Sequence, residues 1–214
     1  MGISCLIMSI LYAIFKDKGE WQGLLVRNLT SLLLLVFACI VVNLTSTLNA
    51  FSLFITIATA ISMFYESIQS VKLNDEKAKK LIAGTSKALM YLAFALSVMS
   101  LASFNALALL GGGLLGLAVG ALVWATKKYN KVQEALPLMF IFFALGLMLG
   151  FGVNSILSSR HLISSVLSVI ASVMFLVSEI LQHFLKEGKL KSILCSELKI
   201  LAIIIFVLSI YLFS

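Results

Sequence analysis

The sequence predicts an all-α, polytopic membrane protein with eight transmembrane helices, and three observations support this fold class. The first is composition: 61% of the 214 residues are hydrophobic and only 12% are charged, whereas a soluble domain is about half apolar and a quarter charged. The second is the length of the apolar runs, several of which match the ~20 residues that cross a bilayer as a helix. The third is that the sequence lacks the alternating polarity of a membrane β-barrel.

The apolar runs define the spans in order. Residues 1–15 are apolar but short, and they lack the basic start and the small-residue cleavage site of a signal peptide. The run 29–64 is too long for one span, so we divide it at the polar residues of 43–49. Five further runs complete the set, separated by polar loops or by the short turn 103–105: 83–101, 106–124, 138–153, 162–182 and 193–213. Pro137 fits a helix start, where its missing N–H costs nothing.

The distribution of positive charge supports this division. With eight spans, and with helix-end residues counted in the loops, 15 of the 16 lysines and arginines fall in the first, third, fifth and seventh loops, and only Arg160 lies opposite. The positive-inside rule makes those four loops cytoplasmic and puts both termini outside. We therefore expect a multi-pass protein of a bacterial plasma membrane, embedded in the lipid bilayer. The net charge of +7 then reflects topology, and we expect no nucleic-acid partner.

Two related segments carry the candidate chemistry, ISMFYESIQ at 61–69 and VMFLVSEILQ at 173–182. Each is an apolar helical run with one glutamate, followed three residues later by a glutamine on the same helix face. The pairs are Glu66 with Gln69 and Glu179 with Gln182. An ionisable group in such a run is costly and by default marks a functional site. Alternatively, each glutamate ends its helix at the headgroup boundary, where a charge costs far less than the ~3 kcal/mol at mid-bilayer.

The two segments also suggest an internal repeat. Each lies in the third helix of one half and is followed by a lysine-rich loop and a final helix. Four spans per half give both halves the same orientation, so we expect a parallel 4+4 repeat with half-repeats at about 1–103 and 104–214, within one transmembrane domain, 1–214. Glu66 and Glu179 would then face each other across the pseudo-two-fold axis. Two such carboxylates can differ in protonation and act as an acid and a base.

The cysteines and histidines do not indicate a metal centre. Cys5, Cys39 and Cys195 lie in or beside apolar runs at spacings that suggest neither a disulfide framework nor a zinc site. His161 and His183 lie at opposite ends of one expected helix, so they cannot share a metal. We expect no metal and no organic cofactor.

This layout resembles the YhhN family of integral membrane proteins, the lysoplasmalogenases, which have eight spans and about this length. The family has an aspartate at the end of the third helix and a Ser-Asp pair at the end of the seventh, after a Gly/Ala-rich run that contains phenylalanine. In this chain Ala171, Phe175, Ser178 and Glu179 stand in that order, and Glu66 stands where the first family aspartate would be. Both acids are therefore glutamates here.

The resemblance implies hydrolysis of the vinyl ether bond of a lysoplasmalogen by carboxylate acid–base catalysis, without a cofactor. Glu66 and Glu179 would be catalytic, and the substrate would be a membrane lipid or lysophospholipid. The fourth helix lacks the family's histidine, and Lys87 and Tyr91 are its only large polar residues. The expected substrate-binding residues are Gln69, Gln182, Lys87, Tyr91 and Ser178.

Two other functions are open. The first is a small transporter that rocks about a paired-glutamate cation or proton site, although the scarcity of Pro and Gly near both glutamates disfavours it, because transporter sites often use broken helices. The second is a non-catalytic member of the same fold.

Overall fold

The structure is a computed structural model that describes residues 20–45, 49–70, 76–102, 104–127, 132–158, 161–185 and 189–213. Within these ranges the protein is all-helical, and seven helices are long and apolar enough to cross a membrane. The expected polytopic helical class is therefore confirmed. The expected first span, 1–15, lies outside the described residues.

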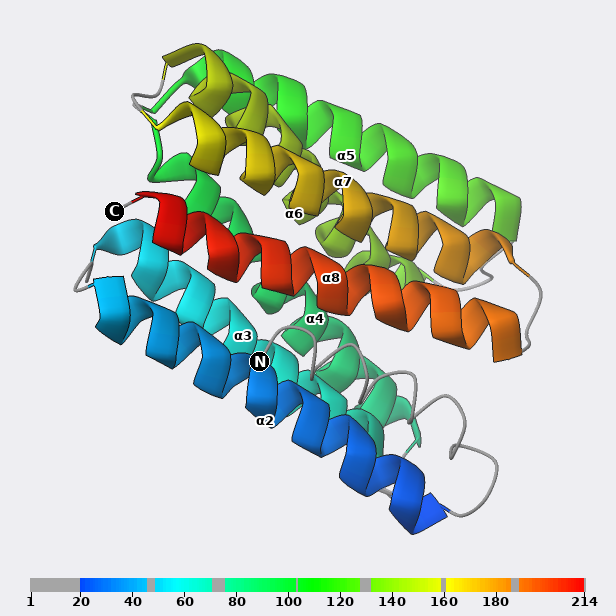
Figure 1. Cartoon of the computed structure of the whole chain (residues 1–214). Coiled ribbons are helices and arrows are strands. Elements are labelled where there is room, and N and C mark those ends of the chain that lie inside the picture. The colour runs from blue at the N-terminus through cyan, green and yellow to red at the C-terminus, as the bar shows by residue number, and fades with distance from the viewer. Residues whose placement is uncertain are drawn as a thin grey trace.

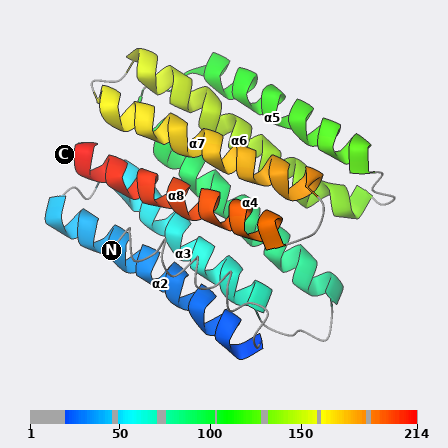
Figure 2. The same ribbon diagram turned by 45° about the vertical axis from the view of Figure 1, so that its right-hand side comes forward.

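The helices run side by side along a common direction, as Figures 1 and 2 show. They are α2 (Glu20–Thr45), α3 (Ala50–Ser70), α4 (Glu76–Met99), α5 (Ala106–Lys127), α6 (Val132–Ser158), α7 (Leu162–Phe184) and α8 (Lys189–Phe213). The expected break within 29–64 is confirmed, because α2 ends at Thr45 and α3 begins at Ala50. Asn49 makes this break: its Oδ1 accepts the backbone N–H of Ser52 at 2.9 Å, as an N-cap does.

The helices extend beyond the apolar runs, and Pro137 shows this most clearly. The expectation that Pro137 starts the sixth span is wrong, because α6 begins at Val132 and contains the proline. The Cβ of Pro137 packs against Gly84 of α4, where a side chain on the glycine would collide with it. Hydropathy finds the part of a helix that lies in lipid, whereas the hydrogen-bonded helix continues into the polar boundary.

Two kinds of packing hold the bundle together. α5 lies against α6 through glycines spaced four apart, Gly112 and Gly116 on one helix and Gly146 and Gly150 on the other. A Cβ on any of them would collide with the backbone of the facing helix, so the G-x-x-x-G spacing permits this close approach. Elsewhere α3 packs on α4, α4 on α6 and α7 on α8, while α2 joins α3 and α8.

The centre of the bundle is an aromatic cluster between α4, α7 and α8. Phe94 stacks on Phe206 with ring centroids 4.7 Å apart, and Phe175 lies 5.2 Å from Phe94. Tyr91 meets Phe175 edge-on at 5.1 Å. All four rings are fully buried. Polar groups one helical turn further along these helices therefore lie next to an apolar interior.

Candidate functional site

Glu179 lies near the end of α7, on the face that this helix buries. The buried positions of α7 are small residues together with Phe175 and Glu179 itself. Small side chains let α7 approach its neighbours closely, and the glutamate is thereby carried into the interior. Its side chain is 0% exposed. A buried carboxylate in a membrane helix needs compensating partners.

Three side chains from two other helices supply this compensation. Lys87 Nζ lies 2.5 Å from Glu179 Oε2, and Lys199 Nζ lies 3.0 Å from Oε1. The hydroxyl of Tyr91 donates a hydrogen bond to Oε1 at 2.6 Å. α4 contributes Lys87 and Tyr91 one turn apart, and α8 contributes Lys199. The carboxylate therefore ties α4, α7 and α8 together.

Gln182 completes what we call the Glu179 cluster, which consists of Lys87, Tyr91, Glu179, Gln182 and Lys199. Gln182 Oε1 accepts a hydrogen bond from Lys87 Nζ at 3.0 Å and another from Lys199 Nζ at 3.1 Å. Both ammonium groups thus lie between the same carboxylate and the same amide oxygen. The structure therefore brings four of the expected site residues together: Glu179, Gln182, Lys87 and Tyr91.

Glu66 lies near this cluster in a different environment. It is partly exposed on α3, and it lies within electrostatic range of Tyr91 and Lys199. Its neighbour Tyr65 is buried, with its ring centroid 5.9 Å from Lys87 Nζ. Gln69 is partly exposed one turn further along α3 and does not join the hydrogen bonds around Glu179 among the described residues.

Ser178 was expected to bind substrate, and the structure gives it a packing contact. Its side chain is fully buried, and its hydroxyl donates a hydrogen bond to the backbone carbonyl of Cys195 at 2.9 Å. This bond joins α7 to α8 one residue before Glu179. Ser178 therefore helps to hold Glu179 against Lys199.

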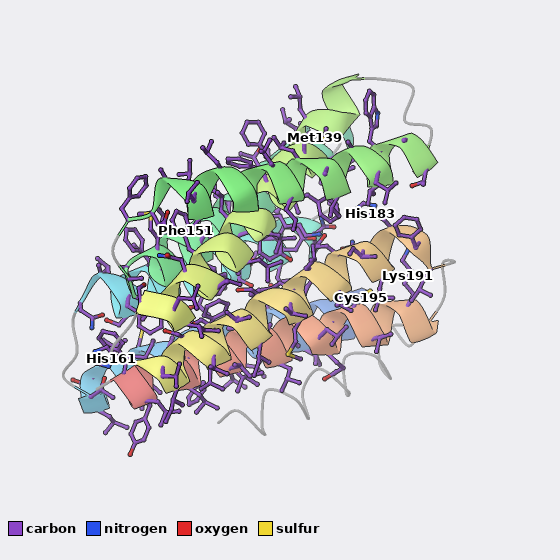
Figure 3. The ribbon with its side chains drawn as sticks, turned by 90° about the horizontal axis from the view of Figure 1, so that it is seen from above. Met139, Phe151, His161, His183, Lys191 and Cys195 are labelled. Carbon is purple, nitrogen blue, oxygen red and sulfur yellow. The ribbon has the colours of Figure 1, made fainter. Side chains whose placement is uncertain are left out.

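The cluster lies toward one end of the bundle. Glu66 and Glu179 are near the ends of α3 and α7, and Lys87 and Lys199 are 11 and 10 residues after the starts of α4 and α8. Figure 3 shows His183 and Lys191 at this end and His161 at the opposite end. At this end α3 and α7 end and α4 and α8 begin.

Two residues near Glu179 and Lys87 are not expected from the sequence: Lys199 and Tyr65. Lys199 was grouped with the seventh loop, although it lies in the apolar run 194–213 that is fit to cross a membrane. Lys87 is likewise counted with a loop, the third, although it lies inside the apolar run 78–99. Spacing was the available signal: each lysine follows a glutamate of the repeated motif by about 20 residues.

The described residues contain no group of three or more His, Cys, Asp or Glu side chains that could hold a metal ion. Cys39 is exposed and Cys195 is buried, and both are free thiols, while Cys5 lies outside the described residues. The donors around Glu179 are ammonium and hydroxyl groups. Ammonium groups repel cations, so a cluster with two of them and one carboxylate suits an anion.

Comparison with known proteins adds no assignment to this geometry: no family model, no curated protein and no solved structure matches this chain.

Proposed function

We propose that this protein is a membrane-embedded hydrolase of the lysoplasmalogenase type, divergent from the YhhN family that its sequence resembles. One observation carries the proposal: Glu179, the glutamate of the Ser-Glu pair, is contacted by Lys87 and Tyr91 of α4. These residues are 92 and 88 positions from Glu179 in the chain. Two expected substrate-binding residues therefore contact one of the two glutamates expected to be catalytic.

The two glutamates suit the two halves of vinyl ether hydrolysis. Transfer of a proton from Glu66 to the vinyl carbon β to the ether oxygen would generate an oxocarbenium ion. Glu179, held as an ion pair with Lys87 and Lys199, would be the second carboxylate and would stabilise that ion. Addition of one water molecule, whose proton returns to Glu66, then gives a hemiacetal, which breaks down to a fatty aldehyde and the free hydroxyl of the glycerophospho-headgroup. Each carboxyl group has one role, as general acid–base catalysis requires.

The proposal includes eight spans in a parallel 4+4 arrangement. Helix contacts in the described part of the chain support it, because they pair under the repeat: α3 with α4 matches α7 with α8, and α2 with α3 matches α6 with α7. The contact of α4 with α6 likewise matches that of α8 with α2. Glu66 and Glu179 then hold equivalent places in the two halves, on α3 and α7.

The lysine-rich loops are proposed to be cytoplasmic, which puts the cluster in the cytoplasmic half of the membrane and both termini outside. A reporter fused after Ser214 tests this orientation. We expect a reporter that is active only outside the cytoplasm to function there. Activity confined to a cytoplasmic reporter contradicts the orientation.

The test of function is aldehyde release from a lysoplasmalogen by the purified protein in detergent. We expect turnover by the wild type and a loss of at least ~10²-fold in Glu179→Gln and in Glu66→Gln, the scale of acid–base contributions. The double variant should lose little more than either single one, because residues that act as a unit are non-additive. Glu66→Asp and Glu179→Asp, which restore the family's residues, should keep activity.

Glu197→Gln is the matched control, because Glu197 is a partly exposed glutamate of α8 outside the cluster. It should retain wild-type turnover. If a verified family member releases aldehyde and this protein releases none, the hydrolase proposal is wrong.

A second candidate is a non-catalytic protein of the same fold. It is favoured by the burial of Glu179, which is 0% exposed and already contacted by three donors. In that case the ion pairs only hold α4, α7 and α8 together. Glu66→Gln and Glu179→Gln would then change stability, and the wild type would show no aldehyde release to lose.

A further inference from the structure

The ammonium groups of Lys87 and Lys199 are brought unusually close together in the Glu179 cluster. Both lie about 3 Å from Gln182 Oε1, and both pair with the same carboxylate. Two positive charges that share one neighbouring atom lie close together, and in a low-dielectric interior they repel strongly. Glu179 neutralises one of them, so the hydrogen-bonded set carries a formal charge of +1.

The charged neighbours in the described part of the chain do not remove this excess. Glu66 lies within electrostatic range of Lys199. Lys191, which is also buried, lies within electrostatic range of Cys195, as do Lys87, Lys199 and Glu179. Glu66 and Lys191 cancel each other formally, which leaves Lys87, Lys199 and Glu179 with the same net charge of +1. An uncompensated charge is expensive inside a membrane, so this arrangement is suited to bind one further anion.

We propose that Lys87, Lys199 and Gln182 form a subsite for the phosphodiester group of a single-chain phospholipid. The proposal deepens the hydrolase function and rests on it for the lipid class. Each ammonium group has three N–H donors, and the hydrogen bonds and ion pairs to Glu179 and Gln182 use two on each lysine. The remaining donors, with the amide N–H groups of Gln182, match the several acceptor oxygens of a phosphodiester.

Access to the subsite is from the end of the bundle. The side chain of Lys199 is 17% exposed and that of Lys87 is 7% exposed, whereas Glu179 is 0% exposed. Gln182 is partly exposed and lies close to the end of α7. Exposure therefore increases from the carboxylate toward Lys199 and Gln182, which is the order expected of a site entered from the headgroup region.

The depth of the groups favours a lipid over free phosphate. Glu179 lies three residues before Gln182 on α7, so it is about 4.5 Å further from that end of the helix. In a lysophospholipid the phosphodiester is at the membrane boundary, and the bond at the first glycerol carbon lies deeper, beside the chain. With the phosphodiester at Gln182, the vinyl ether oxygen falls on the side of Glu179.

The test measures binding without hydrolysis. The probe is a saturated alkyl-ether lysophosphatidylcholine, which lacks the vinyl bond, and the comparison lipid is the corresponding alkylglycerol without a phosphate. We expect the purified protein in detergent to bind the phospholipid at least ~10-fold more tightly, because the phosphodiester accepts charge-assisted hydrogen bonds from both ammonium groups. Lys199→Gln and Lys87→Gln should each lose most of this preference.

Two further variants protect the test against misfolding. Lys199→Gln combined with Glu179→Gln removes one positive and one negative charge, so no glutamate is left without its lysine, and it should also lose the preference. Lys199→Arg keeps the charge and should retain it. Lys80→Gln is the matched control, because Lys80 is an exposed lysine on α4, and it should bind as the wild type does.

Three outcomes overturn the subsite. Equal binding of the two lipids by the wild type excludes phosphate recognition, and an unchanged preference in both single lysine variants excludes these residues. Inorganic phosphate that displaces the probe at the same concentration as the probe itself excludes the lipid as the source of the anion. Aldehyde release is measured separately. If the protein prefers the phospholipid but releases no aldehyde, the hydrolase function is wrong and the subsite stands. If it releases aldehyde without preferring the phospholipid, the subsite is wrong and the hydrolase function stands.

Discussion

The third and seventh helices carry the same Glu-x-x-Gln pattern, yet their glutamates have different environments. Glu179 is fully buried and is held by Lys87, Lys199 and Tyr91, whereas Glu66 is partly exposed. α3 packs directly on α4, but Lys87 and Tyr91 of α4 reach Glu179 on α7. Similar local sequence therefore produces one central ion-paired carboxylate and one peripheral carboxylate, because the partners come from other helices.

This comparison bears on the chemistry, because the two carboxyl groups are suited to different tasks. A carboxylate fixed by three donors is well placed to stabilise positive charge, since it needs no reorganisation when that charge develops. A partly exposed carboxyl group can exchange its proton with solvent more readily. The asymmetry agrees with the division of roles that we propose, in which Glu179 stabilises the cation and Glu66 delivers the proton.

The largest expected effect separates the two glutamates by stability. Glu179→Gln leaves Lys87 and Lys199 buried without their carboxylate, and breaking a buried ion pair costs about 3–5 kcal/mol. Glu66→Gln should cost less than ~1 kcal/mol, as expected for a partly exposed charge. The measurement is unfolding in mixed micelles of increasing SDS fraction. Equal losses in the two variants would contradict the central role of Glu179.

A smaller effect is expected in the coupling between Lys87 and Glu179. Lys87→Gln and Glu179→Gln should be non-additive by ~2 kcal/mol in the free energy of unfolding, within the range for residues in one network. Lys80→Gln combined with Glu179→Gln is the control, because Lys80 is exposed and seven residues away along α4. That pair should be additive within ~0.5 kcal/mol. Additivity of the first pair would show that the contact contributes nothing.

Tyr91→Phe should destabilise the protein by ~1.5–3 kcal/mol, because it removes a hydrogen bond to a charged group and leaves the ring in place. Tyr211→Phe should cost less than ~0.5 kcal/mol, since Tyr211 is 59% exposed. The same SDS unfolding series measures both variants. If the two tyrosines gave the same loss, the hydrogen bond to Glu179 would not be a major part of the cluster.

The smallest expected effect compares the serines that flank the glutamates in sequence. Ser178→Ala removes a buried hydrogen bond between α7 and α8 and should cost ~1 kcal/mol. Ser67 is partly exposed, and its hydroxyl lies 2.9 Å from the backbone carbonyl of Met63 on α3 and 3.2 Å from Asn28 Oδ1 on α2. Ser67→Ala should therefore cost ~0.5 kcal/mol or less. A greater loss at Ser67 would reverse the comparison.

The sequence by itself determined the fold class and the helix positions in the described ranges. Long apolar runs force helices, because a backbone in lipid must satisfy its own hydrogen bonds, and polar residues such as Asn49 mark where the helices end. The same reasoning singled out Glu179, since an ionisable residue in an apolar run stands out in any sequence. Gln182 belongs to the same short segment as Glu179, and Lys87 and Tyr91 are the large polar residues of the fourth apolar run. The sequence does not say which carboxylate they contact.

Only the tertiary structure decided which side chains meet. Lys199 belongs to an apolar run, but its place near the end of that run made it read as a loop charge. Its pairing with Glu179 depends on the close packing of α7 against α8. Ser178 likewise faces Cys195, where the motif suggested a substrate. Sequence spacing assigns a residue to a helix face, but the neighbour of that face is set by packing between helices that are distant in the chain.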